Sequence, residues 1–169
     1  MEGGHSRGIA LVGFGVVIAG ILLTLGLQGS QSSSQSGGGR RVIRAGPNTA
    51  GLPYSPGILV GNTLYLAGTI GEDAANNIVP GGIEAETRRA LANAEDILKA
   101  AGMGFRDVTS VTVYITSFDD FAKFNEVYQE VFSTDPPARA TVQVAALISG
   151  ARVELQMIAV KPVPSSRNR

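Results

Sequence analysis

A change of hydrophobic period between residues 107 and 132 constrains the fold of this chain most. Residues 107–117, DVTSVTVYITS, alternate in polarity and are rich in β-branched side chains, which predicts a strand. Residues 118–132, FDDFAKFNEVYQEVF, repeat apolar side chains at helical spacing, which predicts an amphipathic helix. We interpret its apolar side chains as core residues rather than a ligand-binding box: Phe121, Phe124, Val127, Tyr128, Val131 and Phe132. A strand followed directly by such a helix predicts a helix packed on a sheet.

The rest of the domain extends this pattern. Residues 81–102 predict a second helix that ends at Gly102, with one face formed by Ile83, Thr87, Leu91, Ala94, Ile97, Leu98 and Ala101. Strands are expected at 58–68, as a hairpin around Gly61-Asn62, and at 138–147 and 151–160, with room for another at 41–45. The resulting order, β-β-α-β-α-β-β, predicts an α+β domain in which two helices cover one face of a mixed sheet.

Composition divides the chain into five segments: an N-terminal flank (1–8), an apolar segment (9–27), a Ser/Gly/Gln-rich linker (28–39), the folded domain (40–164) and a C-terminal tail expected to be disordered (165–169). The apolar segment carries no charge and is long enough to cross a hydrocarbon core. No A-x-A cleavage pattern follows it, so we favour a retained membrane anchor over a cleaved signal that would release a secreted protein. The arginines after the linker favour a domain on the cytoplasmic side: Arg40, Arg41 and Arg44.

Charge and residue types exclude several kinds of site. Residues 45–164 hold eight Lys or Arg against thirteen Asp or Glu, and an acidic domain is a poor platform for nucleic acid. The chain has no cysteine, and its one histidine, His5, lies in the Gly-rich N-terminus. Thiolate chemistry, a His-ligated metal and a Ser/His/Asp triad within one chain are therefore not expected.

Polar side chains line the two final strands. Alternation places Arg139, Thr141 and Gln143 on one face of the first strand, and Glu154 and Gln156 on one face of the second. If the strands pair around Ser149-Gly150, both polar rows share a face. That face is then solvent-exposed, or is held by an ion pair between Arg139 and Glu154, or meets another subunit and encloses a polar pocket.

Four segments together resemble the RidA/YjgF family of reactive-intermediate deaminases: GLPYSPGILVGNTLYLAGTIG, ILKAAG, SVTVYITSFDDFAKFNEVYQEVF and PPARATVQVAAL…ARVELQMIAV. The resemblance runs in order from about Gly51 to Pro162. It implies a chorismate-mutase-like fold that forms a homotrimer with a ligand pocket in each cleft between subunits. It also implies hydrolysis of 2-imino and 2-enamino acids, such as 2-aminoacrylate and 2-iminobutyrate, to 2-keto acids and ammonia, with no metal or organic cofactor. Relatives in the mitochondrion or cytosol offer an alternative to the membrane location.

The resemblance assigns roles to individual residues. Arg139 matches the arginine that clamps the substrate carboxylate, and a planar guanidinium suits bidentate binding of that group. Glu154 matches the acid that positions or activates water, and Tyr54 matches a tyrosine at the cleft. Thr141 stands where many members carry cysteine, and Gly68 would let backbone groups approach the ligand closely.

Two positions depart from the family pattern. Ala67 stands where many members carry serine, and Gln156 replaces an acid frequent in the final strand. These departures keep two other interpretations open: a non-catalytic small-molecule-binding or scaffold protein, and, less favoured by the acidic domain, a ribonuclease or translation inhibitor.

Overall fold

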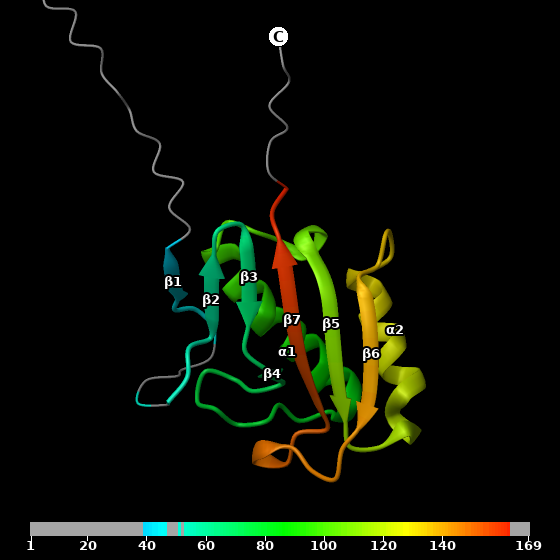
Figure 1. Ribbon diagram of the computed structural model, residues 1–169. Helices are drawn as coiled ribbons and strands as arrows, with labels where there is room; N and C mark the ends of the chain where they lie inside the picture. Colours follow the sequence, from blue (N-terminus) through cyan, green and yellow to red (C-terminus); the bar gives the residue numbers. More distant parts are fainter. Residues whose placement is uncertain (1–38, 47–50, 52, 163–169) are drawn as a thin grey trace, which may run out of the picture. The chain divides into compact units, whose positions relative to one another are not determined.

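The computed structural model describes residues 39–46, 51 and 53–162. These residues form two α-helices, α1 (Gly82–Ala100) and α2 (Phe121–Val131), and seven strands: β1 (Arg40–Ile43), β2 (Gly57–Val60), β3 (Thr63–Leu66), β4 (Thr69–Ile70), β5 (Val108–Ile115), β6 (Ala138–Gln143) and β7 (Val153–Val160). Figure 1 shows the strands side by side with both helices behind them.

The strands make one mixed sheet in the order β1-β2-β3-β7-β5-β6, with β4 pairing to β7. β6 forms one edge and runs parallel to β5, whereas the other pairs are antiparallel. The predicted hairpin is confirmed as β2 and β3, joined at Gly61-Asn62, where Gly61 has a φ of 59°. The additional strand for which the sequence left room is β1.

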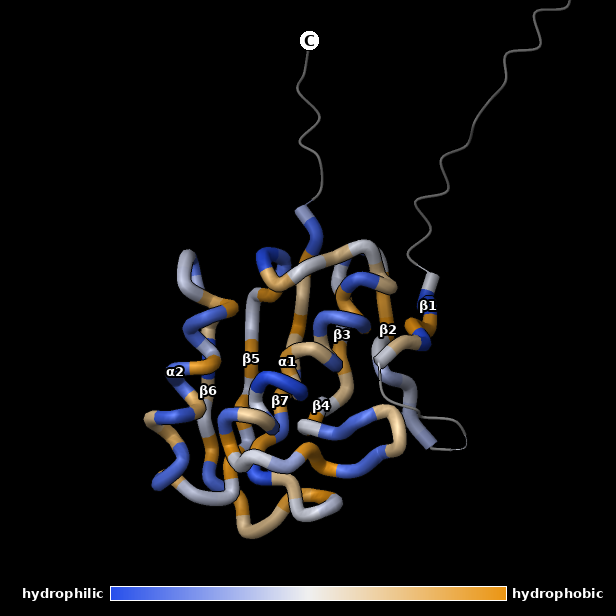
Figure 2. Tube along the Cα trace, turned by 180° about the vertical axis from the view of Figure 1, so that it is seen from behind, coloured by the Kyte–Doolittle hydropathy of each residue, from blue (hydrophilic) through white to orange (hydrophobic). Residues whose placement is uncertain are grey.

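Both helices cover one face of the sheet, and Figure 2 shows the molecule from the side on which they lie. Buried apolar side chains of the helices and strands pack into one core between them. Alternation along β5 and β7 sends the most deeply buried strand residues to this face: Val111, Val113, Ile115, Val153, Leu155 and Met157. The opposite face of these strands carries exposed or partly buried residues such as Tyr114, Glu154 and Gln156. The predicted α+β architecture is confirmed.

Helix α1 begins after Gly81 and ends before Gly102, two glycines with positive φ. Its predicted inner face is confirmed, except that Ala101 is only partly buried. Two polar residues, Glu86 and Asn93, are buried as well, because each satisfies backbone groups. The Glu86 carboxylate accepts from the Arg152 amide at 2.7 Å, and the Asn93 amide donates to the carbonyls of Ile70 and Glu72.

Helix α2 starts three residues later than predicted. The first turn of the predicted segment, Phe118–Asp120, is a 3₁₀ turn, and the Ser117 hydroxyl accepts from the Asp119 amide there. The aromatic side chains predicted to face inward do so, with Phe124, Tyr128 and Phe132 buried and Phe121 partly buried.

One predicted strand pairing is wrong. β6 and β7 do not form a hairpin, because β5 lies between them and pairs with both. The physical reason is the β5-α2-β6 unit, since a crossover through a helix returns the chain as a parallel strand beside the first. The short strand β4 was not predicted.

No helix in the described part of the chain is long and apolar enough to cross a membrane. For that part of the chain, the prediction of a membrane-anchored protein with its domain on the cytoplasmic side is wrong. The apolar segment 9–27, on which the prediction rests, lies outside the described residues, as do most of the linker and the C-terminal tail.

Candidate active site

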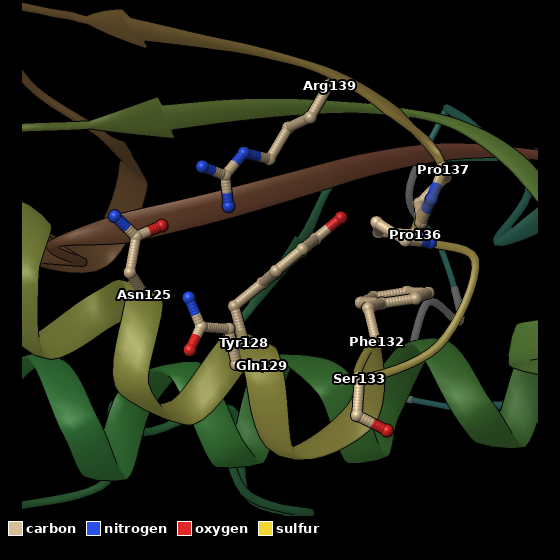
Figure 3. Close-up of a pocket in the computed structure, with 8 residues that line it drawn as sticks. All are labelled: Asn125, Tyr128, Gln129, Phe132, Ser133, Pro136, Pro137 and Arg139. Atoms are coloured by element: carbon tan, nitrogen blue, oxygen red, sulfur yellow. The ribbon is translucent and has the colours of Figure 1, made fainter.

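Arg139 lies on edge strand β6 and extends toward α2, over a groove of about 730 Å³ (Figure 3). Residues of α2, residues of the segment between α2 and β6, and Arg139 line the groove: Asn125, Tyr128, Gln129, Phe132, Ser133, Pro136, Pro137 and Arg139. The parallel register pairs Arg139 with Val111 and Thr141 with Val113, so both side chains project from the helix-covered face. The two prolines before β6, Pro136 and Pro137, form the wall at the far end of the groove.

Glu154 lies on the other face of the sheet. Its β7 position pairs with Tyr114 of β5 and Ile70 of β4, and its side chain is partly buried. Burial raises the pKa of the Glu154 carboxyl. A proton acceptor with a raised pKa is a stronger base than an exposed glutamate, which suits a group that activates water.

Gly68 lies directly against Glu154. A Cβ built on Gly68 would come within 1.7 Å of Glu154 Oε1, so any other residue would displace the carboxylate. The glycine is therefore needed for the close approach of a glutamate of the same chain. The expected approach of its backbone to a ligand stays a prediction. Next to it, the Ala67 amide donates to the Pro56 carbonyl at 2.9 Å and ties this segment to the strand that follows Tyr54.

Tyr54 lies near Glu154, and about half of its surface is exposed. Burial of the remainder is the largest cause that raises the pKa of its phenol, and the charges of Glu72 and Glu154 raise that pKa further. The hydroxyl therefore stays protonated near neutral pH and can donate a hydrogen bond beside Glu154.

The predicted site residues thus form two groups on opposite faces of one sheet. The arginine group holds Arg139 and Thr141, and the glutamate group holds Glu154, Gly68, Ala67 and Tyr54. The prediction that the two polar rows share a face is wrong, because β6 pairs with β5 and not with β7. An ion pair between Arg139 and Glu154 within one chain is excluded for the same reason.

Comparison with known proteins decides the family. A family model described as "Endoribonuclease L-PSP" matches residues 45–161. The chain belongs to this family. This is the RidA/YjgF family, which four segments of the sequence resemble.

Relatives and solved structures agree with this membership. A goat protein named 2-iminobutanoate/2-iminopropanoate deaminase is 44% identical over 124 residues, which cover 72% of this chain and 90% of the relative. The crystal structure of a Thermotoga maritima protein described as a "putative endoribonuclease" matches with a TM-score of 0.70 at 40% identity, covering 73% of this chain and 98% of that one. Escherichia coli TdcF with bound serine matches with a TM-score of 0.66 at 32% identity, over 72% of this chain and 99% of that one. The predicted RidA-type fold is confirmed.

Three residues around these groups were missed by the sequence reasoning. Asn125 extends from α2 on the same side of the groove as the Arg139 guanidinium (Figure 3). Tyr128 lies beneath Arg139, and Glu72 lies near enough to Tyr54 to raise the pKa of its phenol. Helical spacing predicted Tyr128 as a core residue, and nothing in the pattern indicated that its ring would lie against Arg139. Asn125 is one of several polar residues on an amphipathic helix, so nothing in the pattern distinguished it.

Across the described ranges, no three His, Cys, Asp or Glu side chains lie together in a way that would hold a metal ion. The groups that are present can bind an anion at Arg139, donate a hydrogen bond from Tyr54 and accept a proton at Glu154. In this RidA/YjgF member, such a set suits polar addition of water to an activated double bond.

Proposed function

We propose that this protein is a hydrolytic deaminase that converts 2-imino and 2-enamino acids to 2-keto acids and ammonia. The observation that carries the proposal is Arg139, a guanidinium at the mouth of a groove with no ion-pair partner among the described residues. The goat relative, named 2-iminobutanoate/2-iminopropanoate deaminase, and the serine bound to TdcF both suit a site that takes small carboxylic acids carrying nitrogen at C2.

Each step of the proposed reaction has a group on this chain. Arg139 grips the substrate carboxylate through two parallel N–H donors. Water adds to C2 of the protonated imine while Glu154 accepts a proton from that water, which gives a neutral carbinolamine. Glu154 then gives this proton to the nitrogen, ammonia leaves, and Glu154 accepts the hydroxyl proton as the oxygen on C2 becomes the keto oxygen. An imine carbon is already electrophilic, so positioning contributes more than strong activation.

We further propose that the complete site forms between copies of this chain. Arg139 and Thr141 would come from one copy, and Glu154, Tyr54, Gly68 and the Ala67 backbone from its neighbour. This arrangement follows from the opposite faces that the two groups occupy, because one chain cannot bring them to a single ligand. A closed ring of three copies, as the family resemblance implies, repeats the site at every interface.

The experiment that tests the function is hydrolysis of freshly generated 2-iminobutyrate by the full chain and by its Arg139→Ala variant. We expect Arg139→Ala to lower kcat/KM by at least about 10²-fold, since one charge-assisted anchor of the transition state is lost. Arg106→Ala is the matched control, because Arg106 is highly exposed and lies away from the groove. Parent-like activity of Arg139→Ala would rule out the assigned clamp.

The same assay separates the deaminase from a non-catalytic binding protein. A binding protein would retain 2-oxobutanoate without accelerating imine hydrolysis, and Arg139→Ala would abolish that retention. The departures Ala67 and Gln156 make this distinction worth measuring. In this structure Gln156 accepts a hydrogen bond from the Tyr114 hydroxyl at 3.3 Å, so it is engaged within the sheet face rather than free.

A further inference from the structure

The Arg139 guanidinium lies over three aromatic rings of α2. Its Cζ atom is 4.7 Å from the ring centroid of Tyr128, 5.6 Å from that of Phe124 and 5.8 Å from that of Phe121. All three distances fall within the range of a cation–π contact. Figure 3 shows the Arg139 side chain stretched along the groove above Tyr128.

The rings beneath Arg139 belong to a continuous row. Phe121 and Phe124 stack with their centroids 6.5 Å apart, Phe124 and Tyr128 follow at 5.5 Å, and Tyr128 and Phe132 at 4.6 Å. Phe124 is fully buried and Tyr128 is 4% exposed, so packing holds these two rings in place. The support under the guanidinium is therefore part of the core.

Other arginines of the domain are held differently. Arg88 forms a bidentate pair with Glu130, and Arg152 donates to both carboxylate oxygens of Asp120. Such a pair fixes an arginine but occupies the N–H groups that would bind a ligand. An aromatic face attracts the cation through the ring quadrupole and leaves the N–H edges unoccupied.

We propose that Phe121, Phe124 and Tyr128 act as positioning residues that hold the Arg139 guanidinium over α2 with its N–H edge free for the substrate carboxylate. This inference rests on the proposed function. Partial burial makes Phe121 the ring that can be changed at least cost to the core. A lysine at position 139 would keep the cation over the rings but would lose the planar two-donor edge.

The test compares Phe121→Leu with Phe105→Leu in the full chain. Phe105 is also partly buried and belongs to the same aromatic row, with its ring centroid 5.3 Å from that of Phe132, but it has no contact with the guanidinium among the described cation–π pairs. We expect Phe121→Leu to raise the inhibition constant of 2-oxobutanoate and the KM for 2-iminobutyrate about fivefold each, with kcat unchanged. Phe105→Leu should change both constants less than twofold, and Phe121→Tyr should behave like the parent.

Three results would overturn the inference. The first is parent-like constants for Phe121→Leu. The second is an equal loss in Phe105→Leu, and the third is a fall in kcat of Phe121→Leu with an unchanged inhibition constant, since either would indicate a general packing defect. Failure of the proposed function is recognised separately, because the parent chain itself would then not accelerate hydrolysis of 2-iminobutyrate.

Discussion

Arg139 and Glu154 lie on opposite faces of the same sheet. Arg139 pairs with Val111 of β5, whose side chain is fully buried under the helices, whereas Glu154 pairs with Tyr114, which faces the other way. Strand alternation makes this separation a property of the backbone register rather than of side-chain rotamers. A single chain therefore carries two halves of the proposed site.

Gly68→Ala is predicted to lower activity without lowering stability. The new Cβ would occupy the place of Glu154 Oε1 and move that carboxylate, and a displacement of this size costs about 10²-fold in kcat/KM. The Gly68 backbone does not have a positive φ, so alanine introduces no backbone strain. Imine hydrolysis and urea denaturation of the same preparation check both parts.

Gly104→Ala is the control for that substitution. Nothing lies within 4 Å of a Cβ at Gly104, and its φ of −146° is extended. This variant should keep both activity and stability. If Gly68→Ala retained full activity, Glu154 would not need its present position.

Glu154→Gln is predicted to change the pH dependence of both activity and stability. Parent kcat/KM should fall as pH drops through the pKa of Glu154, which burial places above that of an ordinary glutamate. The variant should lose about 10²-fold and show no such acid limb. A raised pKa also means that the folded state binds the proton of the Glu154 carboxyl more tightly than the unfolded state does. The stabilisation that comes from binding this proton is therefore present at low pH and is lost as pH rises through the folded-state pKa.

The pH dependence of stability gives a second readout for Glu154→Gln. Above the folded-state pKa of Glu154, where the partly buried carboxylate is ionised, Glu154→Gln should be more stable than the parent, and the difference should shrink as pH falls through that pKa. Urea unfolding at a series of pH values measures it. An acid limb that persists unchanged in the variant would assign the titration to another group.

Tyr128→Phe is predicted to stabilise the fold and leave ligand binding intact. The Tyr128 hydroxyl is buried without a hydrogen-bond partner among the described residues, and burial raises the pKa of its phenol to about 12. Removing an unsatisfied polar group should add roughly 1 kcal/mol to the free energy of unfolding. The ring face under Arg139 remains, so the inhibition constant of 2-oxobutanoate should not change.

Tyr114→Phe is the matched control, because the Tyr114 hydroxyl donates to Gln156 Oε1. It should be neutral or slightly destabilising in the same urea titration. Destabilisation by Tyr128→Phe would mean that its hydroxyl has a partner, such as a buried water molecule.

Local periodicity predicted most of the fold because apolar side chains mark the helices and longer strands directly. It missed β4, since Thr69 and Ile70 are too short a segment to show a period. It also mispaired β6 and β7, because neighbouring strands in sequence suggest a hairpin. The helical crossover through α2 instead makes β6 a parallel neighbour of β5.

The same mispairing explains what was missed in the candidate site. The family resemblance predicts roles for Arg139, Glu154 and Gly68, but the face of the sheet on which each lies depends on pairing with strands far away in the chain. The contact between Gly68 and Glu154 joins the link between β3 and β4 to strand β7, which is far away in the sequence. The aromatic row under Arg139 was correctly predicted as core, and its second role becomes visible only once β6 lies over α2.

Mixing two inactive variants is predicted to restore activity if the two half-sites come from different copies. In a ring of three copies, Arg139→Ala supplies an intact glutamate group and Glu154→Gln an intact arginine group, so random mixing completes about one site in four. Co-expression with two affinity tags, followed by the imine-hydrolysis assay, measures the recovery. Pairing Arg139→Ala with the double variant Arg139→Ala/Glu154→Gln should recover nothing, because no interface then contains Arg139. Equal activity of the two mixtures would mean that the arginine group of one copy and the glutamate group of its neighbour do not form one site, which would contradict the proposed assembly.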